Sequence, residues 1–450
     1  MSKEDSISKM KDFDLLNQFE LILESDPLID EVGFIHPSQF ATLRKEAEST
    51  ESQSIDGILS SEMVKATVLD PESTNFWNRD HKLGISTHVI LELYKAAKDA
   101  FMESVGQYRR IDNIYTTSED FSSLEKEVMK HSKAILLLSC DFGTAWNSSS
   151  LYESLRKSIL SKKQHIPMFI DELLLSALVL SYSPKSELAW CHRRWVIKMI
   201  AGRCSTMREI IGKESELVEQ IAERSKMNYR AWNHRCWLVS YMTREQVLVE
   251  LKKSRNWAGL HVADNSCFHY RARLMLKILE ESCHKQEAES SDENVEIYQI
   301  WQEELHWNEE LIKHYIGREA LWLHRRFLSL CWIKHFAPLL GDVTHQSKDK
   351  SSMVDDVNFF WDNELYLVNS CSTIPDNNYD DFQAQAVHSA TYILWLIKQI
   401  SKPLGIELTK KLNSGSFVLL NAACPERSSL WSTLTAYVEA TSQLLNEDIY

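Results

Sequence analysis

Four segments of the chain place an aromatic residue, a histidine or tyrosine, and an arginine at one fixed spacing. Trp190 opens WCHRRWV, Trp232 opens WNHRCWL, Trp322 opens WLHRRFL, and Phe268 opens FHYRARL. Histidine can transfer protons or bind a metal, and arginine can hold a phosphate through its fork of donors. A catalytic constellation is normally built once, so a motif repeated along one chain indicates a structural unit.

Each copy of the motif ends a predicted pair of helices. Residues 168–182 have the length and apolar content of a first helix, SPKS forms the turn, and residues 187–200 form the second helix. Ser186 is placed to cap that second helix by accepting from its free backbone amides. The later pairs cover residues 213–242, 244–281 and 295–336, with a degenerate unit at 382–400. The sequence therefore predicts tandem helical hairpins.

Composition and length favour an all-helical array. Only 12 Gly and 9 Pro interrupt 450 residues, and short breaks separate the periodic runs. The length exceeds the roughly 250 to 300 residues at which a single core stops growing. We expect an all-α fold in three parts. The first part is a helical extension at 1–128, which is loop-rich near 41–75. The second part is the repeats at 129–336, with an acidic insert at about 280–296. The third part is a helical region at 337–450 that contains the degenerate repeat.

The charge of the chain argues against nucleic acid as a partner. The net charge is −14, and residues 280–310 hold eleven Asp or Glu against one Lys. Such a chain repels a phosphate backbone. The acidic stretch favours a solvated insert followed by an exposed helix start, and the alternative is a surface for a basic partner. No apolar run is long enough to span a membrane, and the start MSKEDSISKM is too polar for a signal peptide, so we expect a cytoplasmic protein.

The motif residues have the spacing of a packing joint. Residues three apart lie on one face of a helix, so the aromatic residue and the arginine project together toward a neighbouring hairpin. The ring would fill an apolar gap, and the arginine would satisfy carbonyls left unpaired at the end of the adjacent helix. We assign this structural role to the motif residues Trp146, Trp190, Arg193, Trp232, Arg235, Phe268, Arg271, Trp322 and Arg325. The copy at Trp146 is weaker, because Ser149 replaces the arginine.

The sequence contains no pattern of a self-contained active site. His192, His234 and His324 occupy one motif position on three separate units, so convergence on one metal is not expected, and we predict no metal site. Asp376 to Phe382 follows a proline in a polar loop, which favours a turn over a magnesium site. Phosphate-binding loops and nucleophile-elbow motifs are absent from the sequence, and the nine cysteines include no C-x-x-C pair.

Tandem hairpins ending in N-Y-x-x-W-x-x-R resemble the repeats of protein prenyltransferase α subunits, and NYRAWNHR at residues 228–235 is similar to the family motif. The resemblance covers about residues 129–336. Two further stretches, DPLIDEVGFI at 26–35 and NWAGLHVADNSCFHYR at 256–271, resemble the subgroup called prenyltransferase α subunit repeat-containing protein. The resemblance to these α subunits implies a crescent-shaped, TPR-like superhelix of α-α hairpins.

The resemblance also implies a division of labour. The chain would be the non-catalytic α-like subunit of a heterodimer with a prenyltransferase β subunit, which carries the zinc and the isoprenoid pocket. The subgroup suggests the β subunit of Rab geranylgeranyltransferase, with geranylgeranyl transfer to C-terminal cysteines of target proteins. One alternative is a helical-repeat scaffold that binds protein partners without prenyltransferase activity, and a weaker one is a free-standing metalloenzyme with tightly bound zinc.

One family contact departs from the pattern in this chain. In the family, a lysine directly before the Asn-Tyr of one repeat, together with the tyrosine, approaches the diphosphate of the donor. Here Asn228 and Tyr229 match, but Met227 precedes them and the nearest lysine is Lys226. Tyr229 and Lys226 are therefore the candidate diphosphate contacts on this subunit, and we expect the lysine to contribute little.

Overall fold

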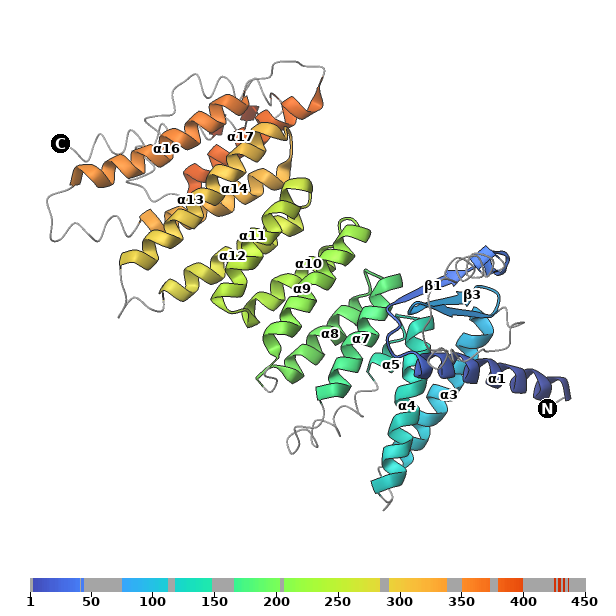
Figure 1. The fold of residues 1–450 in the computed structure, drawn as a ribbon. Helices are drawn as coiled ribbons and strands as arrows, with labels where there is room; N and C mark the ends of the chain where they lie inside the picture. The colour runs from blue at the N-terminus through green and yellow to red at the C-terminus, as the bar shows by residue number, and fades with distance from the viewer. Residues whose placement is uncertain are drawn as a thin grey trace, which may run out of the picture. The chain divides into compact units, whose positions relative to one another are not determined.

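The computed structural model describes residues 3–40, 42–43, 75–111, 118–147, 166–202, 206–283, 291–337, 350–372 and 379–399, with a few scattered residues after 424. The chain divides into two compact units, Met1–His234 and Arg235–Tyr450. Helices dominate both units, as Figure 1 shows, which confirms the predicted all-α class. Within the described residues, no helix is long and apolar enough to cross a membrane.

The first unit begins with long helices packed around a small sheet. The helices are α1 (Lys3–Ser25), α3 (Ile90–Ile111) and α4 (Ser118–Leu138). The strands are β1 (Glu31–Ile35), β2 (Phe76–Arg79) and β3 (Lys82–Ser86), in the order β1-β3-β2. Strand β1 is parallel to β3, whereas β2 is antiparallel to it. Fully buried Phe19, Ile85 and Phe101 join this sheet to the helices in one core.

The sheet is absent from the sequence prediction, which expected only helical pieces and loop in this region. Its strands have four or five residues, too few to give a periodic signal. The turn between β2 and β3 places Asp80 and His81 at φ 51° and 60°. Two consecutive residues with positive φ are the requirement of the tight type I′ hairpin turn, which Asn-Gly or Asp-Gly usually signals. The Asp-His pair gives a weaker signal for the same turn.

The repeats of the first unit follow this core. Their elements are α5 (Gly143–Trp146), α7 (Ile166–Tyr182), α8 (Glu187–Ile200) and α9 (Met207–Arg224), with α10 (Tyr229–Leu238) beginning in this unit. The second helix predicted at 187–200 has the same bounds as α8. Ser186 caps it, since its Oγ accepts from the Ala189 amide at 3.3 Å, as predicted. Helices α7 and α8 therefore form the hairpin that the sequence indicated.

The second unit continues the hairpins. It contains η2 (Val239–Tyr241), α11 (Arg244–Leu260), α12 (Asn265–Cys283), α13 (Ser291–His314), α14 (Glu319–Cys331), the π-helical turn η3 (Trp332–Phe336), α16 (Lys350–Ser372) and α17 (Asp380–Gln399). Helix pairs α11–α12, α13–α14 and α16–α17 pack together (Figure 1). Thr243 and Gln246 form a reciprocal capping box at the start of α11. The last pair includes the degenerate unit predicted at 382–400.

Several predicted features lie outside the described residues. These are most of the loop-rich segment near 41–75, Ser149 of the weak first copy, residues 284–290 of the acidic insert, and the start of the Asp376–Phe382 stretch. The domain boundaries at 128/129 and 336/337 stay predictions. Helix α13 begins at Ser291, within the acidic stretch.

Candidate functional site

The aromatic residues Trp146, Trp190 and Trp322 each pack on a ring of the following hairpin. In the first unit, the centroids of Trp146 and His192 lie 4.8 Å apart, and those of Trp190 and His234 lie 4.9 Å apart. In the second unit, Trp322 lies 5.6 Å from Tyr392. These tilted ring pairs are in the range of favourable aromatic contacts. The aromatic position thus joins one hairpin to the next.

Arg193 connects three helices. From α8, its Nε donates to Glu214 Oε2 on α9 at 2.7 Å, and its Nη2 donates to Oε1 of the same carboxylate at 2.5 Å. Its Nη1 donates to the Leu173 carbonyl at 2.6 Å and to Ser176 Oγ at 2.9 Å, both on α7. A bidentate arginine–carboxylate pair fixes both distance and orientation. Arg193 therefore sets how one hairpin lies on the next.

The same joint recurs in the second unit. Arg271 on α12 donates through Nε and Nη2 to Glu304 on α13, and through Nη1 to the Leu251 carbonyl and Ser254 Oγ on α11. Arg325 on α14 holds Glu364 on α16 in the same bidentate manner. Arg235 on α10 donates to Glu250 on α11 at 2.8 Å. The arginine at this motif position always meets a glutamate on the first helix of the following hairpin.

These acceptors correct the sequence expectation. The arginines were expected to reach carbonyls at the end of an adjacent helix, but Leu173 and Leu251 lie in the middle of α7 and α11. A mid-helix carbonyl already accepts one backbone bond and has a second lone pair for the guanidinium. The main partner is a buried glutamate, because a buried guanidinium needs an opposite charge and not only a dipole.

The histidine or tyrosine of each motif completes the joint. His234 Nε2 lies 2.9 Å from Glu214 Oε2, and His192 Nε2 lies 2.7 Å from Glu172 Oε2. In the second unit, His324 Nε2 lies 2.9 Å from Glu304 Oε1, and the Tyr270 hydroxyl donates to Glu250 at 2.6 Å. In all four pairs the glutamate precedes its partner by 20 residues, on the first helix of the same hairpin.

Burial and charge set the protonation of this site. Burial raises the pKa of Glu214, but the Arg193 charge and the bonds from His234 and Arg193 outweigh it and lower the pKa to about 2. Burial lowers the pKa of His234 despite the nearby carboxylate. The same causes lower the pKa values of Glu304 and His324. At neutral pH the pair is a carboxylate held by one arginine and by a neutral imidazole that donates through Nε2.

The joint is a packing device without access to solvent. Arg193, Glu214 and His234 are all buried, with exposed fractions of 5%, 2% and 0%. No substrate can reach a carboxylate that is closed in by three helices. The histidines, predicted to be structural, bond to different glutamates on different hairpins. In the parts of the chain that the structure describes, no group of three or more His, Cys, Asp or Glu residues could hold a metal ion.

The glutamates were missed by the sequence reasoning. Glu172, Glu214, Glu250 and Glu304 each stand 20 residues before the histidine or tyrosine of the motif, so a regular offset was present in the sequence. Acidic residues in a helix normally indicate a solvated face, which hid this signal. A glutamate repeated at a fixed offset from an arginine motif is the pattern that would have revealed it.

The turn that precedes α10 carries the candidate diphosphate contacts. Asn228 is buried: its Nδ2 donates to the Pro184 carbonyl in the preceding turn at 2.8 Å, and its Oδ1 accepts from the Ala231 amide. Tyr229 and Met227 are 57% and 64% exposed, and Lys226 is also exposed. Met227 has a φ of 55°, so the backbone reverses sharply between Lys226 and Tyr229. The turn thus presents the Tyr229 ring outward while Asn228 anchors its base.

A charged cluster borders Tyr229. Arg230 donates from Nε to Glu187 Oε2 at 2.8 Å, and Arg194 donates from Nη2 to Oε1 of the same residue at 3.1 Å. The Arg230 guanidinium lies 5.3 Å from the centre of the Tyr229 ring. Bonds from Arg230, Cys191 and Arg194 lower the pKa of Glu187 against its partial burial. Arg230, beside Tyr229, and Arg194 are therefore both already held by one carboxylate.

Two segments, residues 169–200 and 211–242, match the family described as Protein prenyltransferase alpha subunit repeat. They correspond to the hairpins α7–α8 and α9–α10. Similar proteins include Protein prenyltransferase alpha subunit repeat-containing protein 1 from Danio rerio, 31% identical over 235 residues, and from Homo sapiens, 28% identical over 256 residues. The resemblance to prenyltransferase α subunit repeats is thereby confirmed.

The extent of these similarities is partial. The alignments cover 44% and 48% of this chain and 53% and 61% of the two relatives, so the chain spans between about half and three fifths of their length. Geranylgeranyl transferase type-2 subunit alpha from Saccharomyces cerevisiae is 20% identical over 193 residues, which are 42% of this chain and 57% of that protein. The similarity thus extends to a protein named as a prenyltransferase α subunit.

Proposed function

We propose that the chain is the non-catalytic, α-like subunit of a heterodimeric protein prenyltransferase. The observation that carries this proposal is the pair of matched repeats at residues 169–200 and 211–242, together with the relative named as a geranylgeranyl transferase α subunit. The partner would be a β subunit of the Rab geranylgeranyltransferase type, which holds the catalytic zinc. The reaction would be geranylgeranyl transfer to C-terminal cysteines of target proteins.

The distribution of burial supports a non-catalytic role for this chain. The histidines and arginines of the repeat motif are used internally, in joints that solvent does not reach. Among the described residues there is no cluster that could hold zinc. Zinc chemistry in the proposed complex would therefore depend on ligands from the β subunit. This chain would hold that subunit and contribute groups at the edge of its pocket.

Tyr229 is the residue of this chain best placed for such a contribution. Its ring is mostly exposed, and the preceding residue, Asn228, anchors the turn by donating to the Pro184 carbonyl. A phenol O–H can donate to an oxygen of a diphosphate leaving group as negative charge develops on it. Lys226 is exposed on the other side of the reversal at Met227 and has no ion-pair partner among the described residues. We therefore expect Tyr229, and not Lys226, to affect the rate.

The test is co-expression of the full chain with a Rab-type β subunit, followed by a transfer assay. The purified mixture is incubated with labelled geranylgeranyl diphosphate, or with the farnesyl donor, and an acceptor that ends in cysteine. We expect a one-to-one complex that contains zinc and transfers the geranylgeranyl group, while neither chain alone is active. The isolated chain should contain no stoichiometric zinc after chelation.

The scaffold alternative gives a different result in the same experiment. A scaffold would co-purify with other proteins and leave every candidate β subunit unbound and inactive. Zinc retained by the isolated chain after chelation would instead support the free-standing metalloenzyme. Either result would overturn the proposed division of labour.

A further inference from the structure

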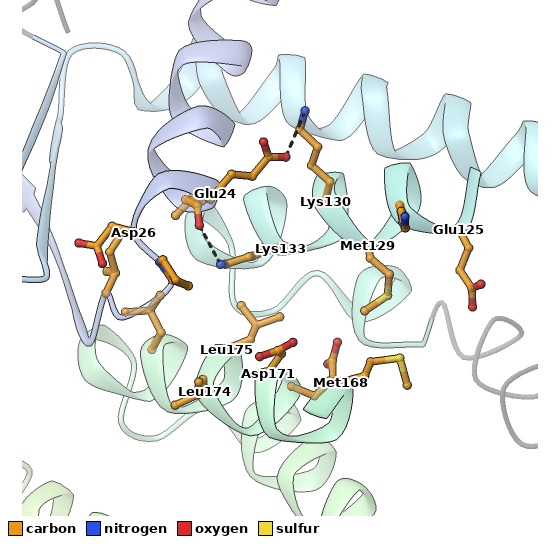
Figure 2. A pocket seen from close by; sticks show the side chains of 16 residues that line it. Glu24, Asp26, Glu125, Met129, Lys130, Lys133, Met168, Asp171, Leu174 and Leu175 are labelled. Atoms are coloured by element: carbon orange, nitrogen blue, oxygen red, sulfur yellow. Dashed lines mark hydrogen bonds and ion pairs between the residues drawn. The ribbon is translucent and has the colours of Figure 1, made fainter. Parts of the chain in front are cut away.

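A cavity of about 770 Å³ lies in the first unit, where α4, α7, the end of α1 and the segment after it meet. Figure 2 shows its side chains, with Lys133 from α4 pointing into the space above Leu174, Leu175 and Asp171 of α7. This volume is within the range of about 300 to 1,000 Å³ that is usual for small-molecule sites. The cavity lies away from the Tyr229 turn, and one of its lining residues, Glu172, belongs to the repeat joint with His192. Its apolar walls are formed mainly by Leu23, Ile29, Met129, Leu174, Leu175 and Leu178.

The charged groups of the cavity differ in whether they already have a partner. Among the carboxylates, Glu24 lies 3.5 Å from Lys130, Asp26 lies 2.9 Å from His81, and Glu172 lies 2.7 Å from His192. These three anions are engaged by basic groups of the protein. The two histidines offset the charge of Asp26 and Glu172 only when they are protonated, so these carboxylates still repel an anion from their side of the cavity.

Lys133 and Asp171 make no ion pair within the described residues, and Glu125 and Lys126 also line the cavity. Lys133 is half-buried, and among the described residues its one hydrogen bond is from Nζ to the Leu23 carbonyl at 3.3 Å. Asp171 is exposed at the edge of the cavity and has no ion pair or hydrogen bond within the described chain. Burial lowers the pKa of Lys133, and the charge of Asp171 is first among the groups that raise it. The cavity thus combines an apolar wall with one half-buried ammonium group, which makes no ion pair within the described residues although Asp171 and three further carboxylates act on it from a distance.

We infer that this cavity binds an aliphatic carboxylate, with its chain on the leucine and methionine side chains and its head on Lys133. A charge-assisted bond from a carboxylate would replace the long bond from Lys133 to a neutral carbonyl. The aliphatic chain would cover the side chains of Leu174, which is 50% exposed, and of half-buried Met129. A singly charged head fits better than a doubly charged one, because among the described lining residues Lys133 is a single half-buried cation without an ion pair and Asp171 repels anions.

The inference is tested on the full chain with cis-parinaric acid, an 18-carbon fatty acid whose fluorescence increases in apolar surroundings. We expect saturable binding that dodecanoate displaces. Dodecanol and dodecyltrimethylammonium should displace the probe at least about tenfold less well, because each lacks the negative head that Lys133 requires. Equal displacement by all three competitors would overturn the role of the head group, and absence of saturable binding would overturn the site.

Variants locate the site. Lys133→Met keeps the length and apolar character of the side chain, and it should weaken binding about tenfold or more. Its matched control is Lys126→Met, seven residues earlier on the same helix and exposed at the rim of the cavity, which should change binding less than about twofold. Asp171→Asn should tighten binding by removing repulsion. Equal affinity of the two lysine variants would contradict the assignment.

A substitution of Leu174 tests the apolar wall of the cavity. Leu174 is 50% exposed, so Leu174→Ser leaves the core intact and shortens only the surface that would hold the chain. We expect weaker binding of long carboxylates and little change for short ones. Thermal melting of every variant checks that the fold is retained. An unchanged dependence on chain length in this variant would place the aliphatic chain elsewhere.

Discussion

Arg193 and Glu214 form two parallel hydrogen bonds across the boundary between two hairpins, from Nε at 2.7 Å and from Nη2 at 2.5 Å. Both side chains are almost completely buried. Removing one member of such a pair leaves the other charge buried without a counter-ion, and this is the main energetic consequence of the joint.

Arg193→Ala should therefore destabilise the chain strongly. We expect a loss of about 3 to 5 kcal/mol in the free energy of unfolding, because Glu214 would keep its charge in a closed site. The next residue supplies the control: Arg194 pairs with Glu187 at the surface, and Arg194→Ala should cost less than about 1 kcal/mol. Urea denaturation of both variants measures the difference. Equal small losses would show that the buried pair does not hold the hairpins.

The acid stability of the chain should depend on Glu214. Its pKa is lowered to about 2 in the folded chain from an ordinary value near 4.5. A group with a depressed folded pKa adds stability above its unfolded pKa, and this contribution is lost as the pH falls toward the folded value. We expect the urea midpoint of the wild-type chain to fall steeply between about pH 4.5 and 2. Glu214→Gln should flatten this fall, whereas Glu216→Gln, at an exposed position of the same helix, should not.

Two glycines should respond to alanine in opposite directions. Gly317 has a φ of 76°, and a Cβ there would lie 2.9 Å from the Asp381 carbonyl oxygen, so Gly317→Ala should destabilise by more than about 1 kcal/mol. Gly212 lies inside α9 with open space around it, and Gly212→Ala should stabilise by about 0.5 to 1 kcal/mol. Thermal melting reports both changes. A stabilising effect at Gly317 would mean that the turn can relax.

The transfer rate of the proposed heterodimer should respond to Tyr229. Removing one donor to a developing charge commonly costs about 10²- to 10³-fold in rate, so Tyr229→Phe should slow transfer measurably. Lys226→Ala should change the rate less than about threefold, as expected for an exposed lysine without a partner. Single-turnover assays with retained β binding measure both. A hundredfold loss from Lys226→Ala would show that the turn returns this lysine to the diphosphate.

The hairpins were predictable because their signal is local. Ser186, the apolar run of α7 and the motif of α8 lie within one stretch of 35 residues, residues 166–200, so periodicity and capping were sufficient. The sheet was not predictable in the same way. Strands β1 and β3 pair in parallel although about 50 residues separate them, as Val32 opposite Leu83 shows. Short strands whose pairing is distant in the sequence leave no periodic pattern.

The candidate site also has parts that could be predicted from the sequence and parts that could not. The spacing of Trp190 and Arg193 indicated that they share a helix face, but it could not identify what lies opposite. Glu214 is contributed by the next hairpin, and an acidic residue in an amphipathic helix looks solvated in the sequence. The exposure of Tyr229 also depends on a distant contact, since Asn228 is held by the carbonyl of Pro184 in the preceding turn.

The joint gives each hairpin a polarity, with a carboxylate on its first helix and a guanidinium on its second. Glu172 of the first repeat receives only His192 among the described residues, and Ile393 stands in α17 where the earlier motifs have arginine. Within the described residues, α7 therefore offers an acceptor that no arginine fills, and α17 carries no donor at the motif position. A donor at that position of α17 would be needed to continue the row by the same bond, whereas a duplicated internal hairpin would find a partner on both sides. The row of joints can thus lengthen by duplication of an internal hairpin.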